Sequence, residues 1–344
     1  MTARYQPPFD MTADIVQLVA DISEQLGRMA AIAEGVDQDQ GLRLRRLHRI
    51  RTIQGSLAIE GNTLNEAQIT AILDGKRVLA PVKDIREARN AIQAYEQFPV
   101  WQPANERDLL QAHRTLMAGL IADAGRYRSG NVGVMNADVV VHMAPPASRV
   151  PPLMADLLAW LATTKQHPLI ASSVFHYEFE FIHPFSDGNG RMGRLWQTLI
   201  LSHWQPLLAQ LPIESMVHAY QYDYYQALNL SNQKSEATPF IEFMLSVIAQ
   251  TIRNETVEMT PQVTPQVTPQ VDALLKVLAK AKKALHRQEL QQLLNLKDRE
   301  SFRLRYLRPA LAAGLLEMTR PEQPNSPLQQ YRLSKLGQQQ AHKG

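Results

Sequence analysis

The sequence predicts an all-α protein that carries one short β-hairpin and a small second domain. In most of the first 255 residues, apolar side chains recur at steps of three and four, the period of a helix that buries one face. Between residues 130 and 152, β-branched residues instead flank a turn signal. Between residues 260 and 271, the unit TPQV is repeated three times, which marks a boundary between two parts of the chain.

The composition is that of an ordinary globular protein, and it excludes several classes. The 344 residues are 45% hydrophobic and 20% charged, which fits two or three domains. Cysteine is absent, so disulfides, thiolate catalysis and cysteine-ligated zinc are excluded. No apolar run reaches the roughly 18 residues of a membrane span, and the N-terminus lacks the apolar core of a signal peptide. We expect a cytoplasmic protein without membrane contact.

The helical period is clearest in four segments before the hairpin: DIVQLVADISEQLGRM, LRRLHRIRTIQGSLAIEG, EAQITAILDG and LLQAHRTLMAGLI. Thr63 followed by Glu66 predicts a capping box at the start of the third segment, and Gly75 ends it. On the second segment, Ser56 and Glu60 are four residues apart and share a face, while Gly61 and Asn62 end the helix. A solvent-facing glutamate is the ordinary alternative for Glu60.

The hairpin and the helix after it follow from residues 130–152, GNVGVMNADVVVHMAPPASRVPP. Asn136-Ala137-Asp138 reads as the turn, and the second strand includes Val140, Val141 and His142. The prolines release the chain into a helix over residues 153–165. A lone hairpin among helices has two edges that need a partner.

Residues 256–271 are predicted to be a linker, because a proline at every fourth position of the TPQV repeat favours an extended, semi-rigid spacer. Beyond it, two or three helices, a strand, a Pro-rich turn and a second strand outline a winged helix over residues 272–344. These residues contain 14 Lys and Arg against 6 Asp and Glu, whereas the rest of the chain contains 22 against 27. The second of these helices carries Arg299, Arg303, Arg305 and Arg308 on or near its exposed side. Contact with DNA, docking to a protein and contact within a homodimer all stay open, as does a merely uneven surface charge.

Residues 183–194, HPFSDGNGRMGR, combine the parts that phosphoryl chemistry needs. Residues 188–190 can bend so that their backbone N–H groups converge at a helix N-terminus and form an anion site. Arg191 and Arg194 are three apart and can grip different phosphates. Asp187 is a hard oxygen ligand suited to Mg²⁺ bound to a nucleotide. The imidazole of His183 can take a proton from an attacking hydroxyl.

Two other interpretations of this stretch are weaker. Gly188-x-Gly190-x-x-Gly193, with Glu214 some twenty residues on, matches a dinucleotide fingerprint. That fingerprint requires a preceding strand in a βαβ unit, and the residues before it, ASSVFHYEFEFIHPF, show none. A purely structural loop would not need two arginines and a histidine at fixed spacing, and we read Phe185 as its anchor in the core.

The stretch resembles the signature of the Fic family, HPFx(D/E)GNGRxxR, at every defined position. The resemblance implies a helical Fic core and transfer of AMP from Mg·ATP to a hydroxyl of a target protein or of the enzyme itself. It makes His183 the base and Asp187 the Mg²⁺ ligand. It assigns ATP binding to the cradle Gly188, Asn189, Gly190, Arg191, Met192, Gly193 and Arg194, of which Met192 stands at a variable position.

The resemblance extends beyond the signature. The hairpin is similar to the family's flap, whose edge would bind the target segment by strand addition, through Val140, Val141 and His142. DYYQALNLSN is similar to the segment that encloses the adenine, so Tyr225 would pack on the base and Asn232 would hydrogen-bond it. Core packing is the alternative for the pair Tyr224 and Tyr225.

SLAIEGN, residues 56–62, resembles the family's inhibitory motif (S/T)xxxE(G/N). The resemblance assigns Ser56, Glu60 and Asn62 to an inhibitory helix in which Glu60 pairs with Arg194 in the place of the γ-phosphate. In some family members the same glutamate supports removal of AMP.

The expected organisation is an N-terminal helical region with the inhibitory motif (1–100), a Fic catalytic core (101–255), the linker (256–271) and the winged helix (272–344). Two other functions stay open: a phosphotransferase that uses the γ-phosphate, and a DNA-binding regulator that only senses nucleotide.

Overall fold

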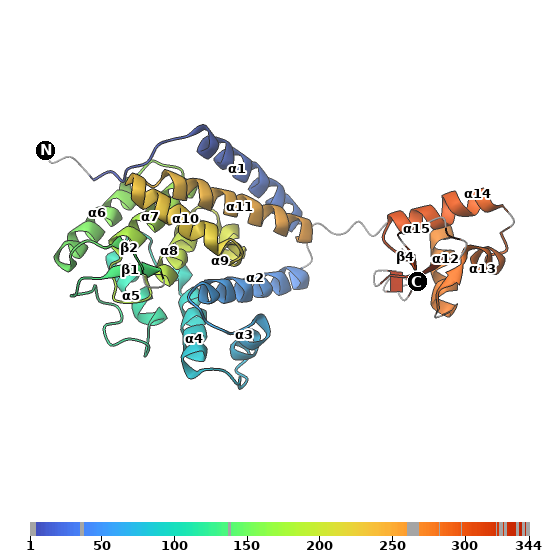
Figure 1. Ribbon diagram of the computed structural model, residues 1–344, viewed down its shortest axis with the longest axis horizontal. Helices are drawn as coiled ribbons and strands as arrows, with labels where there is room; N and C mark the ends of the chain where they lie inside the picture. Colours follow the sequence, from blue (N-terminus) through green and yellow to red (C-terminus); the bar gives the residue numbers. More distant parts are fainter. Residues whose placement is uncertain are drawn as a thin grey trace. The chain divides into compact units, whose positions relative to one another are not determined.

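The computed structural model divides into two compact units, residues 1–259 and 260–344 (Figure 1). The residues that it describes are 5–34, 38–136, 139–259, 268–281, 283–296, 298–320, 322, 326, 329–334, 337–338 and 341. None of the helices in this part of the chain combines the length and the apolarity that a bilayer crossing needs.

The first unit is a bundle of helices, as predicted. Its helices are α1 (Ala13–Glu34), α2 (Gln38–Ile59), α3 (Glu66–Leu73), α4 (Val82–Glu96), α5 (Glu106–Leu116), α6 (Val150–Thr163), α7 (Pro168–Ile182), α8 (Asn189–Trp204), α9 (Ile213–Ala219), α10 (Gln221–Lys234) and α11 (Thr238–Met259). Single 3₁₀ turns cover Phe98–Val100, Ala147–Arg149 and Pro206–Gln210.

The centre of this unit is the pair α7 and α8, which pack on each other and are buried on nearly all sides. A helix that is apolar all round belongs in the interior, and α7 contributes Phe175 and Phe179 to the core. α1 lies along α11 (Figure 1). α2 packs closely on α9, because a Cβ added to Gly55 would lie 2.6 Å from the backbone N and Cα of Ser215.

The hairpin is confirmed at the level of the backbone. β1 (Gly133–Asn136) and β2 (Val139–Met143) pair antiparallel, with an irregularity in register between Val134 and Met135. Residues 137 and 138 of the predicted turn lie outside the described residues, as do the side chains of Val140, Val141 and His142. α6 begins three residues before the predicted start, because proline is favoured in the first helical turn.

The capping box predicted at Thr63 and Glu66 is wrong by two residues. Asn65 caps α3 instead, and the Asn65 and Gln68 side chains bond each other's backbone N–H groups. Thr63 is engaged elsewhere, since its N–H and hydroxyl both donate to the Asp84 carboxylate on α4.

The second unit has its own small core, built around Leu274, Leu290 and Phe302. Its elements are α12 (Pro269–Ala281), β3 (Leu285–His286), α13 (Arg287–Leu293), α14 (Arg299–Phe302), a π-helical turn (Arg303–Leu307), α15 (Arg308–Ala312), β4 (Leu316–Met318) and β5 (Gln330–Leu333). The strands pair antiparallel in the order β3-β5-β4. Helices followed by the strands β4 and β5 match the predicted order, and β3, between α12 and α13, is a strand that the sequence analysis did not predict.

Two predictions for this region need correction. The linker is shorter than 256–271, because α11 continues to Met259 and α12 begins at Pro269. The last repeat starts a helix, since proline suits a first turn and the Thr268 hydroxyl accepts a hydrogen bond from the Val271 N–H. The four arginines, predicted on the second helix, lie on the third helical segment, α14 to α15, because α13 comes before it. This segment contains a π-helical turn before Pro309, which has no N–H for an α-helical bond.

Candidate active site

His183 stands at the end of α7 in a conformation unusual for a residue with a side chain. Its φ of 51° and ψ of 62° lie in the left-handed region, and its N–H still bonds to the Phe179 carbonyl. Its side chain is 21% exposed, and its Nδ1 lies 3.9 Å from Oε2 of Glu180, one helical turn earlier. The imidazole is therefore partly exposed to solvent, although the helix α7 that it follows is buried.

The loop from Pro184 to Gly188 is held by buried contacts. Phe185 is fully buried and stacks on His113 of α5, with ring centroids 3.6 Å apart. The Asn189 side chain bonds both the N–H and the carbonyl of Phe185, each at 2.9 Å. His113 accepts the Gly125 N–H at Nδ1 and donates from Nε2 to the Asp187 carbonyl. Burial lowers the pKa of His113 to about 4, so this ring stays neutral.

α8 begins at this loop with its N–H groups facing the site. Gly188 precedes it with a φ of 87°, and a Cβ there would lie 2.6 Å from Sδ of Met117, so glycine is required. Helix geometry leaves the first N–H groups of α8 without acceptors inside the helix. The backbone arrangement from which the anion site was predicted, a glycine turn that opens a helix, is therefore present.

The Glu60 carboxylate lies at that helix N-terminus. A Cβ added to Gly190 would lie only 2.4 Å from Oε1 of Glu60. The same oxygen accepts a hydrogen bond from Nη2 of Arg194 at 2.7 Å. Arg194 is also bonded to Ser56, through Nε to the hydroxyl at 3.2 Å and through Nη2 to the carbonyl at 3.0 Å. The structure thus brings the predicted pair Glu60 and Arg194 together.

The charges of this pair support each other. Burial alone would raise the pKa of Glu60, but the attraction and hydrogen bond of Arg194 outweigh it and lower that pKa. Burial opposes the charge of Arg194 as well, yet Glu60 raises the pKa of Arg194 above its usual value. The guanidinium is 2% exposed, so Glu60 supplies the negative charge that this cation needs.

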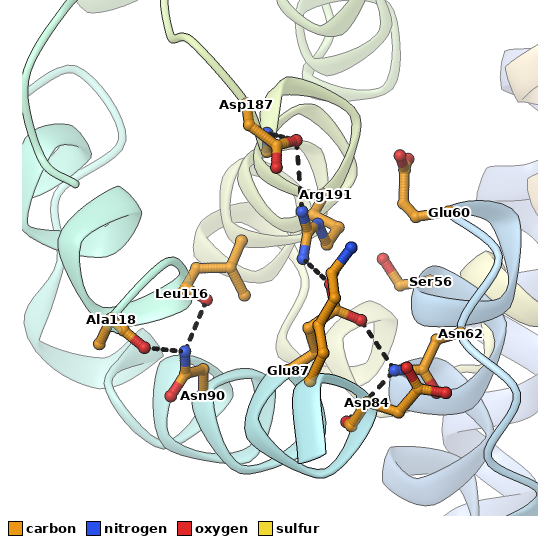
Figure 2. A network of polar contacts seen from close by, with 12 residues as sticks. Ser56, Glu60, Asn62, Asp84, Glu87, Asn90, Leu116, Ala118, Asp187 and Arg191 are labelled. Atoms are coloured by element: carbon orange, nitrogen blue, oxygen red, sulfur yellow. Dashed lines mark hydrogen bonds and ion pairs between the residues drawn. The ribbon is translucent and has the colours of Figure 1, made fainter. Parts of the chain in front are cut away.

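Arg191, also on α8, is held by the carboxylates of Glu87 and Asp187 (Figure 2). Its Nη1 lies 3.0 Å from Oε1 of Glu87 on α4, and its Nη2 lies 3.5 Å from Oδ1 of Asp187. The other oxygen of Glu87 accepts from the Asn62 side chain at 2.8 Å. Asn62, at the end of the predicted inhibitory motif, is therefore linked through Glu87 to the signature arginine.

Three buried groups in this network were missed by the sequence analysis: Glu87, His176 and Glu180. Glu180 Oε1 has no hydrogen-bond partner among the described residues, and burial raises the pKa of Glu180 to about 8. Burial lowers the pKa of His176 to about 3, and this ring is bonded to Gln197 and Tyr224. For His176 and Glu180, the sequence signal was that ionisable residues stand on the largely apolar helix α7, whereas Glu87 lies on the charged helix α4 and had no such signal.

Several predicted ATP contacts have side chains with other partners. The Met192 side chain is fully buried in the core and its N–H bonds to the Gly188 carbonyl, while the Asn189 side chain is used within the loop. Gly193 lies against His176 and Glu180, where a Cβ would come within 3 Å of both. The side chains of Met192 and Asn189 therefore have structural roles. Binding of ATP by Asn189, Met192 and Gly193 stays a prediction, and it would involve their backbone groups.

The two neighbouring tyrosines of the segment expected to enclose the adenine differ in exposure. Tyr224 is a core residue, as the alternative held, whereas Tyr225 is 39% exposed. Burial and the nearby Glu60 raise the pKa of the Tyr225 hydroxyl, so this ring borders the site. Asn232 accepts a hydrogen bond from the Tyr177 hydroxyl at 3.2 Å.

A metal ion would have Asp187 as its protein ligand. The Asp187 side chain is 54% exposed at the mouth of the site. Within the described part of the chain, no group of three or more His, Asp or Glu side chains is arranged to hold a metal by itself. A single carboxylate suits Mg²⁺, which usually takes one or two carboxylates together with substrate phosphates and water.

Comparison with known proteins places this site in a family. Residues 103–201 match the family model described as "Fic/DOC family". Residues 269–334 match a second family model, described as "Filamentation induced by cAMP protein Fic-like, C-terminal domain". The protein adenylyltransferase Fic of Nematostella vectensis is 30% identical over 58% of this chain and 47% of its own length. The protein adenylyltransferase fic-1 of Caenorhabditis elegans is 31% identical over 55% of this chain and 37% of its own length. The chain thus spans less than half of these curated relatives.

Solved structures give a longer match. The crystal structure of a Fic family protein from Desulfovibrio desulfuricans G20 is 52% identical, with a TM-score of 0.71 over 96% of this chain and 99% of that chain. A Fic domain containing signaling protein from Bacteroides thetaiotaomicron is 21% identical, with a TM-score of 0.58 over 72% of this chain and 98% of that one, and shares the fold. On the match to the Desulfovibrio protein and to the Fic/DOC model, this chain belongs to the Fic family.

Proposed function

We propose that this chain transfers AMP from Mg·ATP to a Ser, Thr or Tyr hydroxyl of a target protein, itself included, and that Glu60 restrains the transfer. Curated relatives named protein adenylyltransferase support the reaction class. The geometry supports it as well. His183, in a left-handed backbone conformation, lies close to the N-terminus of α8, and the free N–H groups of a helix N-terminus suit an anion.

Each part of the site has a role in this reaction. The target hydroxyl oxygen bonds to the α-phosphorus, and the bond from that phosphorus to the bridging oxygen of the β-phosphate breaks. Pyrophosphate leaves with the electron pair, and the hydroxyl proton passes to an imidazole nitrogen of His183. The α8 N-terminus and Arg194 stabilise the negative charge of the phosphates. Mg²⁺, held by Asp187 and the phosphates, would neutralise part of this charge.

The position of the Glu60 carboxylate is the observation that carries the proposal of autoinhibition. It lies over Gly190 and bonds Arg194 at 2.7 Å, so it takes both the space and the cation that a terminal phosphate would use. One guanidinium edge cannot serve a carboxylate and a phosphate at once. ATP would then bind only in a pose unfit for transfer.

Labelling with radioactive ATP tests the reaction and the restraint together. Glu60→Gly is expected to raise self-labelling from [α-³²P]ATP at least tenfold, and His183→Ala in the same background is expected to abolish it. Label from [γ-³²P]ATP would identify a phosphotransferase and refute AMP transfer. Unchanged labelling in Glu60→Gly would refute the restraint. The parent protein and Glu60→Gly can also be compared for release of AMP from labelled protein. Faster release by the parent would indicate that the enzyme also removes AMP and that Glu60 supports this removal.

The second unit has a feature that favours a polyanion as its partner. Arg299, Arg303, Arg305 and Arg308 are all exposed on one stretch of α14 to α15. Exposed arginines along one helical segment suit contact with nucleic acid phosphates. We propose that this unit is a winged helix that binds DNA, apart from the transfer reaction.

A further inference from the structure

Arg128 is a buried arginine whose guanidinium is used on backbone carbonyl groups. It is 4% exposed and stands in the segment between α5 and the hairpin. Among the described residues, its guanidinium donates four hydrogen bonds, which go to the carbonyls of Ile182, His183, Gly130 and Pro145. Burying a guanidinium is costly, and a planar fork of donors is the group best suited to bind several fixed acceptors.

Two of these carbonyls belong to the end of α7. Nε of Arg128 lies 2.7 Å from the His183 carbonyl, and Nη2 lies 3.3 Å from that of Ile182. The Arg128 backbone N–H adds a bond of 2.9 Å to the Pro184 carbonyl. One residue therefore binds three consecutive carbonyls around His183. A left-handed conformation is strained for a residue other than glycine, so the conformation of His183 needs such contacts to persist.

The other two carbonyls flank the hairpin. Gly130 precedes it and Pro145 follows it, at 2.9 Å from Nη1 and 2.5 Å from Nη2. The base of the hairpin is closed further by the Ala147 N–H, which donates to the Asn131 side chain at 2.9 Å. Because one rigid guanidinium bonds both ends of the hairpin and the end of α7, these segments cannot move independently.

We propose that Arg128 is a positioning residue that fixes the orientation of His183 and ties it to the base of the hairpin β1–β2. The inference rests on the proposed function for its catalytic meaning, since the hairpin would carry the target and His183 would receive its proton. A misplacement of about 1 Å in such a frame can lower a rate about 100-fold.

The test uses Arg128→Lys, which keeps the charge but loses the fork, in the full chain carrying Glu60→Gly. Arg126→Lys is the matched control, because Arg126 is exposed two residues away. Three quantities are measured: kcat for self-labelling, the Kd of ATP by calorimetry, and the NMR signals of ¹³C-labelled histidine rings, with the His183 signal assigned from His183→Ala. We expect kcat to fall at least tenfold, the Kd of ATP to stay within twofold, and the His183 signal to shift or split. Arg126→Lys should change none of them.

A second variant covers failure of Arg128→Lys to fold. Asn131→Ala removes an exposed contact at the base of the hairpin and leaves Arg128 in place. We expect it to shift the His183 ring signal and to lower kcat severalfold. An unchanged ring signal and kcat in a folded Arg128→Lys, or in Asn131→Ala, would overturn the proposal. If Glu60→Gly transfers no AMP while Arg128→Lys still moves the His183 signal, the proposed function is wrong and the positioning role stands.

Discussion

At the scale of single residues, the site depends on which partner each buried charge has. Arg194 has Glu60 and Ser56, and Arg191 has Glu87 and Asp187. Both arginines of the signature are therefore occupied by side chains in this state. Arg194 is buried whereas the Glu60 side chain is 31% exposed, so removing Glu60 leaves the buried charge of Arg194 without compensation, and a change at Glu60 acts on the whole site.

Glu180 carries a pH dependence that can be measured. Its pKa of about 8 in the folded protein exceeds the usual 4.5, so the folded state binds a proton that the unfolded state releases. The free energy of unfolding should therefore fall as pH rises from about 4.5 to 8. Glu180→Gln has no carboxyl group to titrate at this position, so its free energy of unfolding should lack this decrease. The difference in stability between Glu180→Gln and the parent should therefore shift in favour of the variant as pH rises. Urea unfolding at several pH values measures it, with Glu24→Gln on an exposed face as the control for a lost carboxylate. A constant difference between Glu180→Gln and the parent would contradict the assignment.

At the scale of elements, the restraint depends on how α2 is held against the rest of the unit. Gly55 gives α2 its close approach to α9, and Asn62 at its end bonds the Glu87 side chain on α4. The segment that carries Glu60 is thus fixed at both ends by neighbouring helices. Its position over α8 follows from packing and not from the ion pair alone.

Gly55→Ala tests this packing. The added Cβ would lie 2.6 Å from backbone atoms that cannot turn away, so we expect a loss of about 1–3 kcal/mol in the free energy of unfolding. Displacement of α2 should also weaken the restraint and raise self-labelling. Gly27→Ala is the matched control, because nothing lies within 4 Å of its Cβ on α1, and it should stabilise the protein by up to about 1 kcal/mol. Equal stability of the two variants would contradict the close approach of α2 and α9.

Several elements could be predicted from residue patterns, whereas their contacts could not. The helical period predicted the bundle, and the glycines at 61 and 75 marked two helix ends correctly. The cap of α3 was misplaced because Thr63 is bonded by Asp84, which is 21 residues away in sequence. Local patterns do not record such long-range competition for a side chain.

At the scale of the whole molecule, the two units have separate cores. The apolar cluster of the first unit includes Ile15 and Ile252, and that of the second runs from Val271 to Tyr331, without shared members among the described residues. Each unit can therefore bury its apolar surface by itself.

A chain ending at Met259 tests this independence. We expect it to fold, to keep Glu60→Gly self-labelling within about twofold of the full chain, and to lose salt-dependent binding to double-stranded DNA.

The full chain should bind DNA more weakly as salt rises. The double variant Arg303→Ala with Arg305→Ala should reduce the slope of log affinity against log salt concentration by about two. Circular dichroism, labelling and a DNA titration measure these quantities. Equal DNA binding by the truncated chain would refute the role assigned to the second unit.

The sequence by itself determined the helical class, the hairpin, the second unit and the signature from His183 to Arg194, because period and spacing are local properties. Only the tertiary structure decided which partners those residues have. It brought Glu60 over Gly190, joined Asn62 to Arg191 through Glu87, and set Arg128 between His183 and the hairpin. The bonds from Asn62 to Glu87, from Arg191 to Glu87 and from Arg194 to Glu60 span 25, 104 and 134 residues of sequence. Only the packing of helices brings residues so far apart in the chain within hydrogen-bond distance.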